Sequence, residues 1–223
     1  MKTLIAATAL SVLLAVPAPA QTTAPKTEDM FYSQRGEWRA LKLVGANVTN
    51  AAGETIGQIN DLLINKDQKV TSAVIGVGGF LGVGERNAAF TFNTLQLTRD
   101  AKDNPLVRAN VTKDQLKTTP EWQWNPASGE WRTNKLIGAK VTNTAGETIG
   151  DINDILIDKD AKVAAAVIGV GGFLGMGERH AAVSFSSLQL TRDPNNDPLV
   201  RVNLTKEQLK AAPEWKWQPA TGK

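Results

Sequence analysis

The strongest constraint on the fold of this chain is an internal duplication. The tetrapeptide Gly-Glu-Trp-Arg stands at residues 36–39 and again at residues 129–132, and the same offset relates Trp122 to Trp215. Aligned without a gap, the two copies are about two-thirds identical, and a repeat of this kind is weighed before any other signal. The unit is too long for a solenoid repeat and has the size of a small domain. We therefore predict two tandem domains, residues 36–128 and residues 129–223.

Each copy contains several short runs of β-forming residues separated by turns. Ile56 and Ile59 are three residues apart, which breaks the alternation of a strand, and a bulge near Gly57 would restore it. Strands of this length and spacing indicate a small β-barrel. The predicted fold class is all-β dominated, and we expect each copy to enclose its own apolar core. The predicted strands of the first copy are residues 42–49, 54–64, 69–77, 86–92 and 105–111, and the two barrel cores lie at about 41–111 and 134–204.

The end of each copy changes character. Thr112 and Gln115 have the spacing of a capping box, and residues 205–208 repeat it. A helix of one to two turns is predicted to follow and to end before Pro120 or Pro213. Each helix leads into an extended segment with two tryptophans whose spacing of two places both on one face. These tryptophans are Trp122 and Trp124 in the first copy and Trp215 and Trp217 in the second.

The first 35 residues predict export. Lys2 precedes an apolar run that ends in Pro-Ala-Pro-Ala, which is typical of a cleaved signal peptide over residues 1–20. The run is shorter than the ~20 residues of a spanning helix. Residues 21–35 are rich in Thr, Pro and charge and indicate a flexible leader. We expect a periplasmic protein without a transmembrane segment once the signal is removed. The chain has no cysteine, so neither disulfides nor lipidation at a thiol can contribute.

Composition argues against several classes of function. The formal charge is +3, with acids and bases interspersed, so no basic stripe predicts nucleic-acid binding. His180 is the only histidine, and with neither a second histidine nor a thiol it predicts no zinc site and no nucleophile–base pair. We therefore expect a protein that is not an enzyme and has no cofactor.

Two further patterns could bind ions. The glycines of residues 78–84 and 171–177 follow the order Gly-Gly-x-x-Gly-x-Gly, which matches neither phosphate-binding motif, and we interpret them as hairpin turns. Asp154, Asp158 and Asp160 could supply oxygen ligands, but a calcium loop needs more ligands and a closing glutamate. We interpret the acids as solvated residues of turns and strand ends.

Three segments of the second copy resemble the PRC-barrel domain, which is named for the globular domain of the photosynthetic reaction-centre H subunit. They are residues 136–143, residues 146–158 and residues 167–178, the last of which ends in the Gly-Gly-Phe-Leu-Gly-x-Gly-Glu turn. The turn is similar to that of exported PRC-barrel proteins of alphaproteobacteria. The resemblance implies a small β-barrel that serves as an interaction module, and it carries no catalytic residues over to this chain.

The leading hypothesis is a non-enzymatic scaffold that binds a protein partner in the cell envelope. The candidate partner-binding residues are those of the glycine-flanked tips, Phe80, Leu81, Phe173 and Leu174, and the tryptophans Trp122, Trp124, Trp215 and Trp217. For the tips the alternative is folding over the barrel end, and for the tryptophans it is packing against a barrel. Two other functions stay open: a small-ligand or metal-binding envelope stress protein, and an H-subunit-like assembly factor of a photosynthetic or redox complex. The two copies are also expected to pack as an intramolecular pseudo-dimer or to form a homo-oligomer.

Overall fold

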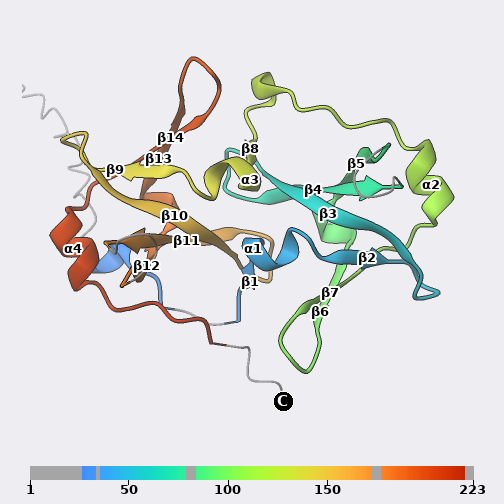
Figure 1. Cartoon of the computed structure of the whole chain (residues 1–223), viewed down its shortest axis with the longest axis horizontal. Coiled ribbons are helices and arrows are strands. Elements are labelled where there is room, and N and C mark those ends of the chain that lie inside the picture. Colours follow the sequence, from blue (N-terminus) through green and yellow to red (C-terminus); the bar gives the residue numbers. More distant parts are fainter. Residues whose placement is uncertain (1–26, 34–35, 79–83, 172–176, 219–223) are drawn as a thin grey trace, which may run out of the picture.

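The chain forms two β-rich halves that lie side by side along its long axis (Figure 1). This computed structural model describes residues 27–33, 36–78, 84–171 and 177–218. The first half comprises β1 (Trp38–Arg39), α1 (Ala40–Leu43), β2 (Asn47–Thr49), β3 (Thr55–Ile64), β4 (Val70–Val77), β5 (Arg86–Thr91), β6 (Gln96–Arg99), β7 (Pro105–Arg108) and α2 (Lys113–Thr118). The second comprises β8 (Trp131–Arg132), α3 (Thr133–Leu136), β9 (Lys140–Thr142), β10 (Thr148–Ile157), β11 (Val163–Val170), β12 (Arg179–Ser184), β13 (Leu188–Arg192), β14 (Pro198–Val202) and α4 (Lys206–Ala211). Single 3-10 turns lie at Thr27–Met30, Phe92–Thr94, Pro126–Ser128 and Phe185–Ser187.

The two sheets have the same topology. One runs β5-β4-β3-β2-β7-β6 and the other runs β12-β11-β10-β9-β14-β13. Neighbouring strands are antiparallel, except that β2 pairs in parallel with β7 and β9 with β14. The predicted fold class is therefore confirmed as two tandem small β-barrels of one design.

The first strand of each repeat has changed places with its equivalent. β1 belongs to the first repeat but pairs antiparallel with β10 of the second, with Trp38 opposite Ile157. Likewise β8 pairs with β3, with Trp131 opposite Ile64. The repeats therefore complete each other's sheets, so the expectation of two self-contained barrels was wrong in this respect.

A second contact links the halves at the two equivalent turns before β4 and β11. The Val70 N–H donates to the Ala161 carbonyl at 2.8 Å, and the Val163 N–H donates to the Gln68 carbonyl at 2.7 Å. The symmetric pair Lys69–Lys162 forms an antiparallel bridge between the two sheets. The contact thus follows the pseudo-twofold relation of the repeats.

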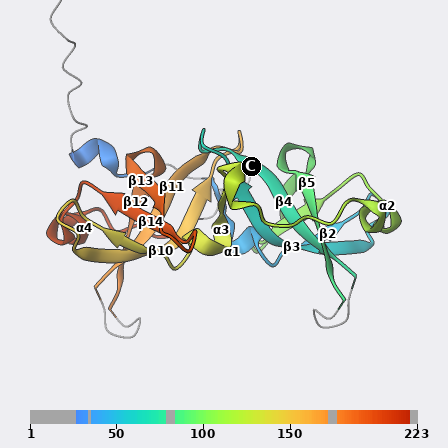
Figure 2. The same cartoon turned by 90° about the horizontal axis from the view of Figure 1, so that it is seen from above.

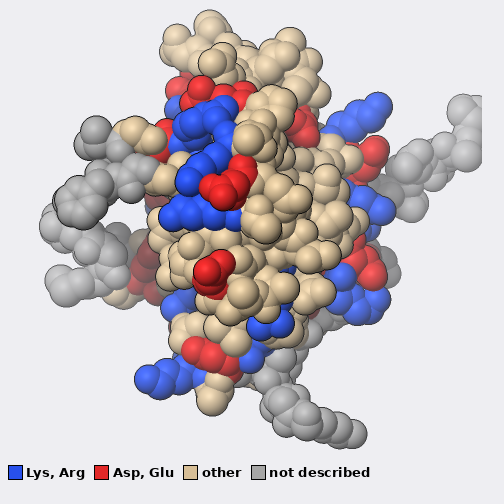
Figure 3. Space-filling view, turned by 90° about the vertical axis from the view of Figure 1, so that its right-hand side faces the viewer, with Lys and Arg blue, Asp and Glu red and all other residues tan. Residues whose placement is uncertain are grey.

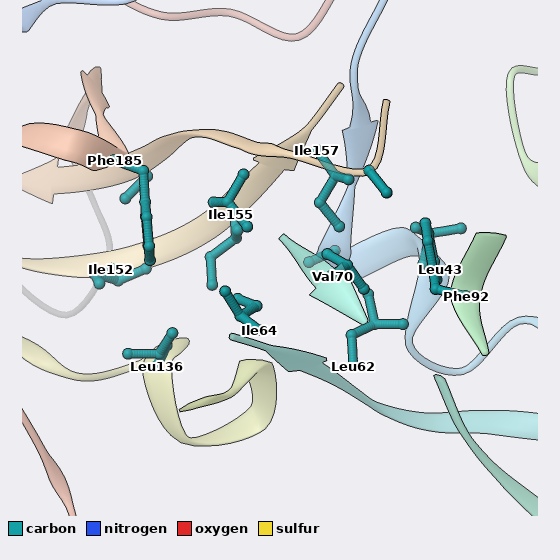
Figure 4. Close-up of a cluster of buried hydrophobic side chains, with 14 of the residues drawn as sticks. Leu43, Leu62, Ile64, Val70, Phe92, Leu136, Ile152, Ile155, Ile157 and Phe185 are labelled. Carbon is teal, nitrogen blue, oxygen red and sulfur yellow. The ribbon is translucent and has the colours of Figure 1, made fainter. Parts of the chain in front are cut away.

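Most of the buried apolar side chains belong to one core cluster that contains residues of both halves. Leu62 and Ile64 of β3 lie in the same cluster as Ile155 and Ile157 of β10 (Figure 4). All four are less than 1% exposed. Because burial of apolar surface is the main stabilising term in a small domain, neither repeat retains its full core without the other.

The start of each repeat differs from the predicted strand. Residues 42–49 were expected to be extended, but α1 ends at Leu43 and β2 begins only at Asn47. Leu43 is fully buried, and Gly45 follows at a φ of +89°, which glycine adopts without strain. Strand β7 also ends at Arg108 rather than at residue 111.

The predicted bulge in the second strand is confirmed. Val48 pairs with Gly57 and Thr49 with Thr55, so that Ile56 has no opposite residue in β2. Gly57 is required here because a Cβ at this position would lie 2.5 Å from the Gly76 carbonyl oxygen. The strand thereby brings both Ile56 and Ile59 into the core, where each is at most 1% exposed.

Both predicted capping boxes are present. Thr112 Oγ1 accepts from the Gln115 N–H at 3.1 Å and the Gln115 side chain accepts from the Thr112 N–H at 2.8 Å, and Thr205 and Gln208 repeat this pattern. The helices α2 and α4 lie at opposite ends of the long axis (Figure 2). Each directs the following tryptophan segment back toward the other half.

Part of the segment expected to be a flexible leader is packed on the second repeat. Met30 is 4% exposed, and Phe31 forms an antiparallel bridge with Val183 of β12. The apolar run Met-Phe-Tyr explains this, since it interrupts an otherwise polar segment. The predicted signal peptide, residues 1–20, lies outside the described residues. Among the residues that are described, no helix is long and apolar enough to cross a bilayer.

Candidate functional site

The four candidate tip residues cannot be placed. Phe80 and Leu81 fall within residues 79–83, and Phe173 and Leu174 fall within residues 172–176, both outside the described ranges. Their role in partner binding stays a prediction. The four candidate tryptophans are described, and they occupy the join between the repeats.

Tryptophans and arginines alternate across this join. In the order of contact, one series is Trp38, Arg99, Trp217, Arg39 and Trp215, with guanidinium carbons 3.9, 5.5, 5.5 and 5.7 Å from the successive ring centroids. The equivalent series is Trp131, Arg192, Trp124, Arg132 and Trp122, at 4.1, 5.5, 5.7 and 5.7 Å. We call these the two tryptophan–arginine ladders. All six tryptophans of the chain take part.

Each ladder combines residues of both repeats. The tail residue Trp217 of the second repeat packs with Arg99 of the first, and Trp124 of the first packs with Arg192 of the second. A cation over an aromatic face contributes about 0.5–2 kcal/mol, more when it is shielded from water. The tryptophan segments therefore hold the join together, as the packing alternative predicted.

A buried carboxylate anchors each ladder. Asp154 is 1% exposed and accepts from Arg39 Nε at 2.5 Å, from the Leu41 N–H at 3.0 Å and from the Ile155 N–H at 2.8 Å. Asp61 accepts in the same way from Arg132 Nε at 2.6 Å. Each carboxylate thus accepts hydrogen bonds from the exchanged strand of the other repeat. The interpretation of Asp154 as a solvated residue was therefore wrong, because its side chain is buried.

The remaining acids of this motif do not converge on a cation. Asp158 Oδ1 caps its own turn by accepting from the Asp160 and Lys162 N–H groups at 2.9 Å. Asp160 pairs with Lys159 at 2.7 Å. Within the described part of the chain, no group of three potential ligands is close enough to hold a metal ion.

His180 lies on β12, where its ring is half exposed. Its Nε2 is 2.9 Å from Asn153 Nδ2 and 3.7 Å from a Glu178 carboxylate oxygen. Asn87 takes the equivalent place in the first repeat and accepts from Asn60 at 2.9 Å. Asn87 and His180 thus make the same kind of contact, a hydrogen bond to an asparagine on another strand of the sheet. An amide can take the place of the imidazole, so this contact does not require a histidine.

Sequence reasoning missed the arginines of the ladders. The signal was available, since Trp38-Arg39 and Trp131-Arg132 repeat a tryptophan–arginine pair at the start of each copy. Burial lowers the pKa of the Arg192 guanidinium. The charge is nevertheless retained, because the ordinary pKa of arginine exceeds 12.

The outer edge of β12 is covered by the chain itself. The Trp215 N–H donates to the His180 carbonyl at 2.7 Å, and the Tyr32 N–H donates to the Ala182 carbonyl at 2.9 Å. The Tyr32 hydroxyl donates to the Glu37 carboxylate at 2.7 Å. The pKa of the Tyr32 phenol is raised, mainly by burial and to a smaller extent by this hydrogen bond. Residues 30–32 therefore act as an added strand on the second sheet.

The equivalent edge of β5 is covered only in part. The Trp122 N–H donates to the Asn87 carbonyl at 2.7 Å, as its counterpart does on β12. Beyond that point, no backbone group of the described residues pairs with the outer edge of Ala89 or Phe90. Both residues are half-buried, whereas their counterparts Ala182 and Val183 are at most 3% exposed. Among the described residues, the β5 edge beyond Asn87 therefore lacks the added strand that covers β12, and we call it the open edge of β5.

The face shown in Figure 3 has no large patch of one charge. Blue and red side chains lie interleaved on it.

Two small β-barrels of one topology, joined by exchanged strands, define the class of this protein. A model of the PRC-barrel domain matches the chain twice, over residues 36–115 and 129–208. These matches cover well over half of the chain, and the protein therefore belongs to the PRC-barrel domain family. A comparison with curated proteins found no significant match.

Proposed function

We propose that this protein is a non-enzymatic periplasmic scaffold that binds an extended segment of a protein partner along the open edge of β5. The observation that supports this is the unequal cover of two equivalent edges. An exposed strand edge is a template for a further strand, in which main-chain hydrogen bonds provide affinity and side-chain contacts provide specificity.

The covered edge of β12 shows which backbone groups such a strand would use. Ala182 pairs with Val167 of β11, yet its carbonyl accepts from Tyr32 on the opposite side. In an antiparallel ladder the N–H and C=O of one residue point to the same side. Ala89 pairs with Val74 in the same register, so its N–H and C=O also face away from the sheet.

The side chains near the open edge fit an aromatic segment. On β12, Tyr32 packs against the buried cluster of Leu156, Ala165, Val167 and Ala182. The first repeat offers Leu63, Val74 and Ala89 at these positions, with Ser72 where the second repeat has Ala165. Glu130, the counterpart of Glu37, lies beside β4, where it accepts from Thr71 Oγ1 at 2.8 Å. In the proposed complex, this carboxylate would accept a hydrogen bond from a hydroxyl group of the bound segment, as Glu37 does from Tyr32.

The chain itself provides a probe for this edge. A peptide with the sequence of residues 27–33 should bind the intact protein at one site, because the β12 edge is already occupied. Ala89→Pro should abolish binding: it removes an outward N–H and blocks close approach of a strand without deleting a ladder hydrogen bond. Ala89→Val, which keeps the N–H, should bind the peptide. The measurement is an NMR titration of isotope-labelled protein.

A photo-crosslinker at Thr91 extends the test to the cell envelope. Thr91 is exposed at the end of the open edge, and Ser184 is its half-buried counterpart on the covered edge. A protein adduct is expected from position 91, is not expected from position 184, and should be lost when Ala89→Pro is added. Equal adducts in the Ala89→Pro background would refute docking on this edge.

A further inference from the structure

A second feature, independent of the β5 edge, is a pocket that occurs twice in the molecule. The first pocket has a volume of about 220 Å³ and the second about 190 Å³. Each is formed by the first strand, short helix and last hairpin of one repeat and is closed by a tail tryptophan of the other. The residues of the first pocket are Trp38, Arg39, Lys42, Arg99, Lys102, Asp103, Asn104, Pro105 and Trp217, and every one has its repeat counterpart in the second pocket.

The aromatic wall of the first pocket is held in place by polar contacts. Arg99 stacks on Trp38 at 3.9 Å and donates to Asp103 Oδ1 at 3.1 Å and to the Glu37 carbonyl at 2.5 Å. The Trp217 indole N–H donates to Asp103 Oδ2 at 2.9 Å. Both oxygens of the only carboxylate lining the pocket are thus already engaged.

The two pockets differ in charge. In the second pocket, Lys135 Nζ forms an ion pair with Asp197 at 2.8 Å. In the first, the counterpart of Asp197 is Asn104, so Lys42 lacks this partner, and Lys102 adds a cation where the second pocket has Asn195. Lys42 and Lys102 form no ion pair with other described residues. The first pocket has four cations and one acid in its lining, and the second has three cations and one acid.

We propose that the first pocket binds a small organic anion consisting of a carboxylate on a single ring. The two lysine ammonium groups would receive the carboxylate, and the Trp217 indole with Pro105 would contact the ring. The volume is below that of pockets for drug-sized ligands, so it suits one ring. The site is distinct from the β5 edge and does not depend on a protein partner.

The test uses the full-length protein and three ring carboxylates: benzoate, cyclohexanecarboxylate and glucuronate. Their comparison separates a flat aromatic ring from an aliphatic ring and from a sugar acid. Titrations are followed by the indole N–H signals in NMR. Binding should move the Trp217 signal in a saturable way, weaken with added salt, and leave Trp124 unmoved.

Substitution of the two lysines provides the decisive comparison. Lys42→Gln with Lys102→Gln should weaken binding about tenfold or more, while Lys135→Gln in the second pocket should leave it unchanged. All three lysines are exposed, so these variants are expected to fold. Equal affinity in the double variant, equal shifts of Trp124 and Trp217, or no saturable shift with any of the three carboxylates would each overturn the proposal.

Discussion

Replacing Asp154 by alanine is expected to destabilise the whole protein by about 3–5 kcal/mol, the cost of removing one partner of a buried ion pair. The Arg39 guanidinium and the N–H groups of Leu41 and Ile155 all lose their acceptor. Because Arg39 belongs to the exchanged strand, the loss loosens the join and not only the second sheet. Urea unfolding followed by tryptophan fluorescence gives the free energy of unfolding.

Two controls separate this effect from a general loss of charge. Asp61→Ala should cost a similar amount, since Asp61 holds Arg132 at 2.6 Å in the equivalent join. Asp160→Ala should change stability by less than about 0.5 kcal/mol, because its pair with Lys159 is exposed. If Asp154→Ala lowered the free energy of unfolding as little as Asp160→Ala does, the Asp154 carboxylate would not hold the exchanged strand β1 in place.

A single repeat, residues 36–128, is expected to form a dimer by exchanging its first strand with a second copy. Alone, the repeat leaves the β3 edge without the Trp131–Arg132 strand, and its own Trp38–Arg39 strand has no β10 to join. Two copies restore both contacts, as in domain swapping. Small domains of this size have little stability to spare, so the monomer should be largely unfolded at low concentration.

Light scattering coupled to gel filtration measures this outcome. The repeat should have about twice its own mass, with unfolding that depends on protein concentration. The variant Asp61→Ala of the same repeat should remain monomeric. A stable monomer that unfolds independently of concentration would show that the strand folds back onto its own sheet.

Much of the fold could be predicted from the sequence because its signals are local. The capping boxes at Thr112 and Thr205 and the bulge at Ile56 each depend on a few neighbouring residues, and the structure contains them. The exchange could not be predicted. The Trp38–Arg39 strand meets Leu-Ile on either sheet, at residues 63–64 or at residues 156–157, so the local sequence offers both partners equally.

The candidate site was predicted less well, for a related reason. The tryptophans were named as candidates for partner binding, and the arginines that contact them were not predicted. Pairs such as Arg99 with Trp217 and Arg192 with Trp124 lie far apart in sequence, so no local pattern indicates them. The open edge of β5 has no sequence signal of its own. It follows from the position of residues 30–32, whose apolar run was overlooked within a polar leader.

Engineered disulfides test the exchange of strands most directly, since the chain has no cysteine of its own. Directly opposite residues of an antiparallel pair lie within the range of Cα distances that a disulfide spans. Trp38→Cys with Ile157→Cys should form an intramolecular disulfide under mild oxidation, because these residues are opposite each other in β1 and β10. Trp38→Cys with Ile64→Cys should not. The reverse result, a disulfide between positions 38 and 64 and none between 38 and 157, would contradict the account.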